Sequence, residues 1–204
     1  MLSVDTSHRR QTASSPTTTA HRSSHHKSTL KGRASMHLNK EESHQLYERT
    51  KSELHFIPST DSIFPPFKLQ KPYVIYDISQ TYDTDFIDIL PETVTKAFIR
   101  STQPGEKLYA IDWFHSYFLY DPRNPDDGQS VYVEDATHPD GGYRAYFPGF
   151  YPDGDYFFFI DQHFRFGYLA HPWREEVWIF GQPLIAEFEQ IYPQLGWIKK
   201  QDFS

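Results

Sequence analysis

Cysteine is absent from the 204 residues, and no long hydrophobic run occurs. Without cysteine the chain has no disulfide framework, no thiolate nucleophile and no cysteine-ligated zinc site. This composition fits a reducing compartment, and we expect a cytoplasmic protein. Because a transmembrane helix needs about 20 consecutive apolar residues, we also expect no membrane span.

Basic residues are in the minority, with 20 Lys and Arg against 27 Asp and Glu, which gives a formal net charge of -7. A protein that binds duplex nucleic acid presents a basic face to the phosphates. We therefore expect no nucleic-acid partner. The excess of acid favours a basic protein as partner.

The first 35 residues contain no Phe, Tyr or Trp, although these residues make up 17% of the chain. This segment has six Lys or Arg and one acid, Asp5, so its formal charge is +5 and that of residues 36–204 is -12. A polar segment without large apolar groups cannot offset its ordering entropy by burial. We expect residues 1–35 to be a disordered basic extension rich in Ser, Thr and His, and residues 36–204 to form a single domain.

Three interpretations of this extension compete. A secretory signal requires a continuous apolar segment, which residues 1–35 lack. A basic, Ser-rich and acid-poor composition matches an organellar transit peptide, but Pro16 and its Thr neighbours do not favour the amphipathic helix of such peptides. We favour an unstructured extension, with Met36 as the working start of the protein.

Alternation and turn residues predict an α+β fold for the rest of the chain. Asn39 and Glu42 have the spacing of a capping box at the start of a helix. The expected helices are 40–54, 91–100, which starts at Pro91, and 183–191. The expected strands are 73–78, 107–113, 116–120, 155–160, 164–170 and 175–180, with a short one at 129–134 inside the long loop 121–153. Short connections predict an antiparallel β-meander with helices on one face.

Two sets of motifs resemble the bacterial family of unknown function DUF2716, from about Glu41 to the C-terminus. The first set is Gly105–Trp113, His115 and Tyr120-Asp121-Pro122. The second set is Tyr151–Tyr156, Phe164–Gly167, His171-Pro172-Trp173 and Ile179–Gly181. The resemblance implies a bacterial origin and a shared fold, and it supplies no reaction. Within these motifs, the residues expected to form a motif surface are Trp113, Phe166, Gly167, Pro172 and Trp173.

The same motifs contain the side chains that could carry chemistry. The catalytic candidates are His115, His171, Asp112, Asp153 and Asp155, and the metal-ligand candidates are His115, His171 and Glu175. If the sheet brings both imidazoles and one carboxylate together, they have the ligand types of a mononuclear metal site or the groups of a general acid-base pair. Asp-Gly turns and a rigid His-Pro-Trp turn explain these residues without a ligand, and we favour this structural explanation.

Two functions follow from these patterns. The first is a small acidic interaction protein, by analogy with an immunity protein that meets a basic toxin, whose contact surface is the second aromatic face of the sheet and the acidic loop 121–140. The alternative is an enzyme or metal-binding protein that uses His115, His171 and a nearby carboxylate. No organic cofactor is expected, a metal is not excluded, and the sequence predicts no oligomeric state.

Overall fold

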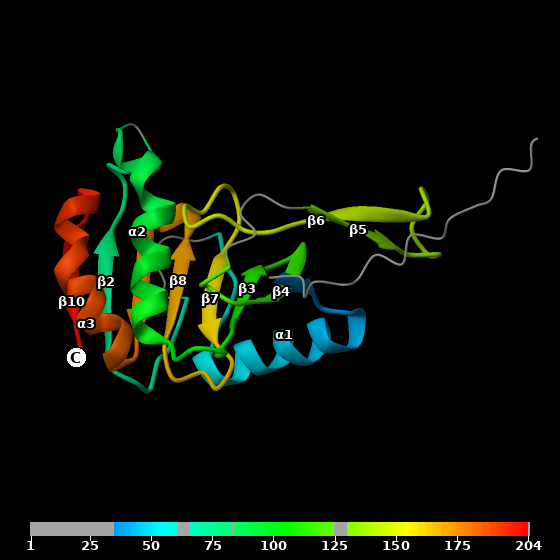
Figure 1. Cartoon of the computed structure of the whole chain (residues 1–204), viewed down its shortest axis with the longest axis horizontal. Helices are drawn as coiled ribbons and strands as arrows, with labels where there is room; N and C mark the ends of the chain where they lie inside the picture. The colour runs from blue at the N-terminus through cyan, green and yellow to red at the C-terminus, as the bar shows by residue number, and fades with distance from the viewer. Residues whose placement is uncertain (1–34, 61–65, 83, 125–129, 204) are drawn as a thin grey trace, which may run out of the picture. The chain divides into compact units, whose positions relative to one another are not determined.

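The computed structural model describes residues 35–60, 66–82, 84–124 and 130–203, and these residues form an α+β structure around a large antiparallel sheet (Figure 1). The eight strands of this sheet lie in the spatial order β1 (Ser35–His37), β4 (Ser116–Tyr120), β3 (Leu108–Asp112), β7 (Phe157–Asp161), β8 (Gly167–His171), β9 (Glu176–Phe180), β2 (Tyr73–Asp77) and β10 (Ile198–Asp202). Every neighbouring pair is antiparallel. The α+β fold with its antiparallel sheet is thus confirmed.

Both faces of the sheet are covered by other parts of the chain. Side chains alternate along each strand, so neighbouring residues on one strand point to opposite faces. On β7, Phe159 joins one hydrophobic core with helices α2 (Phe86–Ser101) and α3 (Gln182–Ile191). Phe158 joins a second core on the other face, with helix α1 (Lys40–Leu54) and the segment that follows it. The expectation of helices on one face was therefore incomplete, since α1 covers the face opposite α2 and α3.

Helix α1 begins and ends where the sequence predicts, because its signals are local. The Asn39 side chain accepts a hydrogen bond from the Glu42 amide at 3.0 Å, and the Glu42 carboxylate accepts one from the Asn39 amide at 2.9 Å. This capping box satisfies two amides that have no partner inside the helix. Leu46, Thr50 and Leu54 then fall on one buried face.

Helix α2 begins at Phe86, five residues before the predicted start at Pro91. The prediction placed proline in the first turn, where its missing N–H costs nothing. In the structure Pro91 lies inside the helix, one turn further on. The longer helix buries three side chains in the first core, those of Leu90, Val94 and Phe98. The free energy gained by this burial outweighs the one backbone hydrogen bond that Pro91 cannot donate.

The long loop 121–153 contains a separate two-stranded hairpin, of which the sequence predicted only the first strand. Its strands are β5 (Ser130–Glu134) and β6 (Gly142–Tyr146), and they pair antiparallel. One face of the hairpin packs toward the first core through Val131, Val133 and Ala145. The other face leaves Tyr132 and Tyr146 exposed to solvent.

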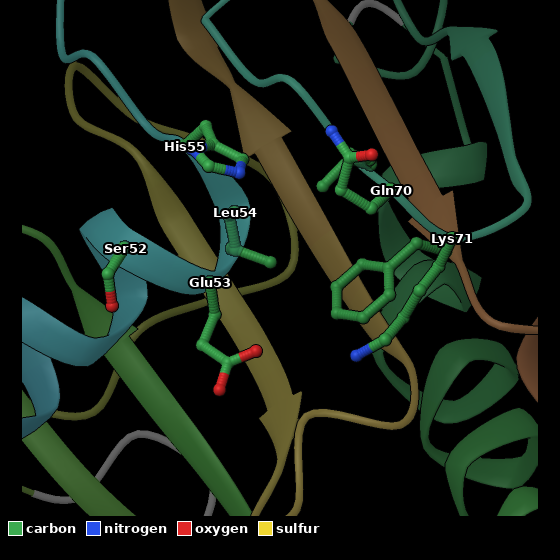
Figure 2. Close-up of a pocket in the computed structure, with 8 residues that line it drawn as sticks. Ser52, Glu53, Leu54, His55, Gln70 and Lys71 are labelled. Carbon is green, nitrogen blue, oxygen red and sulfur yellow. The ribbon is translucent and has the colours of Figure 1, made fainter.

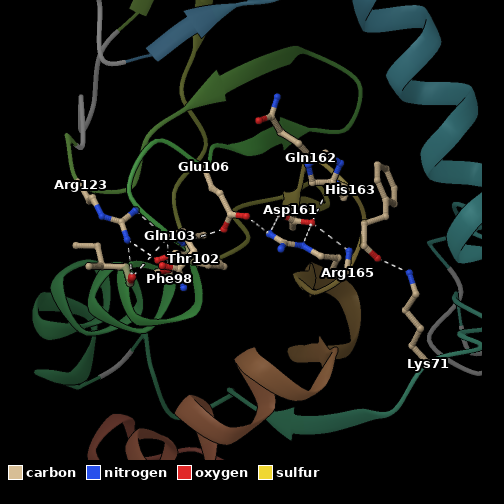
Figure 3. Close-up of polar contacts among 12 residues, drawn as sticks. Lys71, Phe98, Thr102, Gln103, Glu106, Arg123, Asp161, Gln162, His163 and Arg165 are labelled. Carbon is tan, nitrogen blue, oxygen red and sulfur yellow. Dashed lines mark hydrogen bonds and ion pairs between the residues drawn. The ribbon is translucent and has the colours of Figure 1, made fainter.

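Two arginines in connecting segments form hydrogen bonds to the ends of helices and strands (Figure 3). Arg123 donates hydrogen bonds to the Ile99 carbonyl at 3.0 Å and to the Thr102 hydroxyl at 3.0 Å, at the C-terminal end of α2. Cations are favourable there because the last carbonyls of a helix carry partial negative charge. Arg165 forms a bidentate pair with the buried carboxylate of Asp161, at 2.9 and 2.7 Å, in the turn between β7 and β8.

The N-terminal extension expected over residues 1–35 lies almost wholly outside the described residues, which begin at Ser35. Ser35 and Met36 belong to β1 and pair with β4. None of the helices in the described part of the chain combines the length and the hydropathy of a membrane span.

Candidate functional site

Three of the predicted site residues meet at the turn between β3 and β4. The His115 Nδ1 atom lies 2.9 Å from Asp112 Oδ1 and 3.4 Å from Asp155 Oδ2. One nitrogen or oxygen atom from each residue lies within 4.8 Å of those of the other two. Asp112 and Asp155 are largely covered, with side chains 16% and 9% exposed, whereas the His115 ring is 68% exposed.

Strand register brings these residues together although Asp155 lies 43 positions after Asp112 and 40 positions after His115. Asp112 ends β3, and its cross-strand partner on β7 is Phe157, two residues after Asp155. The Trp113 amide donates to the Tyr156 carbonyl at 3.1 Å, which extends the pairing past the end of the strand. The chain then turns, and the His115 amide donates to the Asp112 carbonyl at 3.0 Å. This turn places the His115 ring over the two carboxylates.

The three groups influence one another electrostatically. Burial raises the pKa of the Asp112 and Asp155 carboxyls, and the opposing hydrogen bonds only partly reduce this effect. The hydrogen bond to Asp112 raises the pKa of His115 above its ordinary value despite partial burial. Near neutral pH, the cluster can therefore hold a proton on His115 between two carboxylates.

His171 does not belong to this cluster, so the structure does not bring the two imidazoles together. It follows Leu169 of the second core by two residues, whereas Asp112 follows Ala110 of the first core, so the two side chains point to opposite faces of the sheet. His171 is fully buried, and its Nε2 lies 3.3 Å from the Tyr156 hydroxyl. Its Nδ1 has no hydrogen-bond partner in the structure. Burial, assisted by the charge of Arg174, lowers the pKa of His171 to about 4.

The other predicted site residues also lie apart from the three-residue cluster. Asp153 is exposed and does not belong to the group of potential ligands. Glu175 is exposed in a left-handed turn conformation after Trp173, and it too lies outside that group.

The expected motif surface is largely interior. Trp113, Phe166 and Gly167 are buried, because they pack in or against the two cores. Pro172 is half-buried, and Trp173 alone of the five is exposed. The second aromatic face of the sheet, expected as a contact surface, is likewise covered by α1 and cannot receive a partner.

A groove of about 450 Å³ lies beside the cluster, and we call it the hairpin groove. It runs between the hairpin, the start of α1 and the β3–β4 turn. Its apolar lining comes from Leu38, Phe114, Tyr117, Val133 and Tyr143, and its polar lining comes from His37, Asn39, Lys40, Ser43, His115, Glu134 and Asp135. The exposed His115 ring therefore borders a concave surface, which is where recognition or chemistry takes place most often.

A smaller pocket of about 280 Å³ lies at the end of α1 (Figure 2). Glu53 and Lys71 extend toward it from opposite sides, and Phe180 is among the residues that line it. Both charged groups have partners within the chain, because Lys71 donates to the Phe164 carbonyl and Glu53 pairs with Arg49. The pocket at the end of α1 therefore offers less to a ligand than the hairpin groove does.

Sequence reasoning did not single out three exposed aromatic residues: Phe114, which lines the hairpin groove, and Tyr132 and Tyr146, which lie on the outer face of the hairpin. Phe114 is 65% exposed, Tyr132 is 55% exposed and Tyr146 is 60% exposed. The alternation of Val131, Tyr132 and Val133 is a signal for Tyr132, since it places the tyrosine opposite the two valines. Tyr146 has no such signal, because the strand that contains it was not predicted.

Comparison with known proteins identifies a family without a known activity. The family model described as "Protein of unknown function (DUF2716)" matches residues 37–185. A curated relative, "Uncharacterized protein YxiI" from Bacillus subtilis (strain 168), is 27% identical over 141 residues, which cover 65% of this chain and 77% of the relative. No solved structure matches the chain. From the extent of the family match, the chain belongs to the DUF2716 family.

Proposed function

We propose that the protein is a small acidic interaction module, active in the cytoplasm, that binds a basic protein through the β5–β6 hairpin and the hairpin groove. The observation that carries this proposal is the exposure of Tyr132 and Tyr146 on the outer face of an ordered hairpin. Tyrosine provides a large contact area at low entropic cost, and it is enriched where interfaces are strongest. An immunity protein that neutralises a basic toxin is one example of such a module.

The hairpin positions the Tyr132 side chain and the Tyr146 backbone before any partner binds. The Tyr132 ring lies against Gly142 across the hairpin, since a Cβ atom added at Gly142 would come within 2.8 Å of the Tyr132 hydroxyl. At the other end, the Ser116 hydroxyl donates to the Tyr146 carbonyl at 2.5 Å and ties β6 to β4. Side chains that are already ordered lose less entropy on binding.

Charge complementarity supports a basic partner. Residues 36–204 carry a formal charge of -12. Glu134 and Asp135 line the hairpin groove, and Asp140 is exposed in the connection between β5 and β6. Acidic groups around an aromatic contact accelerate association with a basic protein and disfavour acidic competitors.

The double replacement Tyr132→Ser and Tyr146→Ser tests this proposal. We expect the variant to bind the partner at least tenfold more weakly, because it removes two aromatic contacts without disturbing the core. The partner is first captured from a cell extract with the full chain, then purified, and its affinity for each variant is measured by calorimetry at two salt concentrations.

Tyr82→Ser is the matched control, since Tyr82 is 67% exposed on the segment before α2 and its ring lies against Tyr151, outside strands β5 and β6. The proposal requires a basic partner whose affinity survives in the control, falls in the double variant and weakens with salt. Equal affinity for the double variant and the control would place the contact surface elsewhere.

A further inference from the structure

The geometry points to a binding site for a divalent transition-metal ion formed by Asp112, His115 and Asp155. This proposal is independent of the protein partner proposed above. It concerns a different set of ligands from the His115, His171 and Glu175 set predicted from the sequence. The three residues come from two segments that the β3–β7 pairing holds side by side.

The separations between the potential ligand atoms match those around a metal ion. For metal–ligand bonds of about 2.1 Å, two ligands at a right angle lie about 3.0 Å apart, and two at a tetrahedral angle lie about 3.4 Å apart. The His115 Nδ1 atom lies 2.9 Å from Asp112 Oδ1 and 3.4 Å from Asp155 Oδ2. The potential ligand atoms of Asp112 and Asp155 lie within 4.8 Å of each other, so small side-chain adjustments would let a cation contact all three residues.

The local charge also favours a cation. Two carboxylates are largely covered here, and the ion pairs of the described residues give each of them only His115 as a positive partner. Elsewhere in the described chain a buried carboxylate has a permanent cation, as Asp161 has in Arg165. Covered carboxylates are costly unless they are paired or bind a metal ion. A divalent ion would balance both carboxylates of the cluster.

The donor types indicate the class of metal. One imidazole nitrogen and two carboxylate oxygens suit zinc, manganese, iron(II) and related ions, whereas calcium takes six to eight oxygen ligands. Three protein ligands leave coordination positions for water or for a bound group. These positions would open to solvent, because the His115 ring is exposed and borders the hairpin groove.

Equilibrium dialysis of the full chain against Zn²⁺ tests the site. We expect His115→Ala and Asp155→Asn to bind one zinc ion fewer than the parent, or to bind that ion at least tenfold more weakly. The leading segment also contains histidines, so each variant is also made in a chain in which His8, His21, His25 and His26 are replaced by Ser. In that background the parent is expected to bind one zinc ion.

His44→Ala is the matched control, because it removes an exposed histidine of α1 outside the cluster. It should bind zinc like the parent. A second measurement, the rise in unfolding temperature caused by Zn²⁺, should be present in the parent and His44→Ala and lost in His115→Ala. If His115→Ala and His44→Ala bind zinc equally in the background that lacks His8, His21, His25 and His26, or if the parent binds none there, the site does not exist.

Discussion

Replacing Gly181 with Ala is expected to lower the free energy of unfolding by about 4 kcal/mol, because the new side chain has no space and the wrong backbone conformation. Gly181 has a φ of +85° between β9 and α3. A Cβ atom there would lie 2.3 Å from the Arg165 carbonyl oxygen and 2.7 Å from the Phe166 Cα atom. These neighbours are backbone atoms, so they cannot move aside as a flexible side chain can. Urea unfolding followed by tryptophan fluorescence measures the loss.

Gly154→Ala is the matched control for this prediction. Gly154 has nearly the same φ, +82°, but a Cβ atom added there meets nothing within 4 Å. We expect a loss of about 1 kcal/mol, which reflects the backbone conformation alone. If both variants lose the same stability, the close contact between the β9–α3 junction and residues 165–166 is not present as described.

Acidification from pH 6.5 to pH 4 is expected to remove about 3 kcal/mol of stability through His171 alone. The pKa of His171 is lowered from 6.5 to about 4, mainly by burial. The unfolded chain therefore takes up a proton near pH 6.5, whereas the folded chain takes it up only near pH 4. Because the unfolded state binds more protons in this window, the free energy of unfolding falls as the pH falls.

His171→Gln isolates this contribution, since glutamine keeps a polar group beside Tyr156 and does not titrate. The difference in unfolding free energy between the parent and His171→Gln should shift against the parent by about 3 kcal/mol between pH 6.5 and pH 4. A constant difference between the parent and His171→Gln across this window would show that His171 is not neutral and buried.

Local signals in the sequence predicted most of the helices and strands. The strands that the sequence did not predict depend on pairing with residues far away in the chain. The capping box of Asn39 and Glu42 fixes α1 without help from the rest of the chain. Strands β1 and β10 at the two edges of the sheet carry weak local patterns, and they form because β4 and β2 offer unpaired edges. The aromatic sheet expected from the sequence is present, but only the tertiary structure shows which elements cover each of its two faces.

In the candidate site, too, residue type was readable from the sequence, whereas the spatial arrangement depends on strand pairing. His115, Asp112 and Asp155 were singled out by residue type, and the β3–β7 register brings them together. His171 was singled out by the same criterion, but strand alternation directs it to the opposite face. A shift of one residue along a strand moves a side chain to the other face of the sheet. Residue type alone therefore cannot decide which side chains meet.

A contact surface and a metal site at one end of the sheet are compatible, because His115 borders the hairpin groove. The tyrosines of the hairpin would supply contact area, and the cluster would hold a cation beneath the exposed imidazole. The paired variants separate the two proposals, since Tyr132→Ser and Tyr146→Ser leave the potential ligands intact and His115→Ala leaves the tyrosines intact.

Amide hydrogen exchange of the full chain, alone and with its purified basic partner, locates the contact surface directly. We predict slower exchange on binding in β5, in β6 and in the β3–β4 turn at residues 113–115, with no change in α2 and α3. Protection confined to α2 and α3, with unchanged exchange in the hairpin, would contradict the proposal that the hairpin groove is the functional surface.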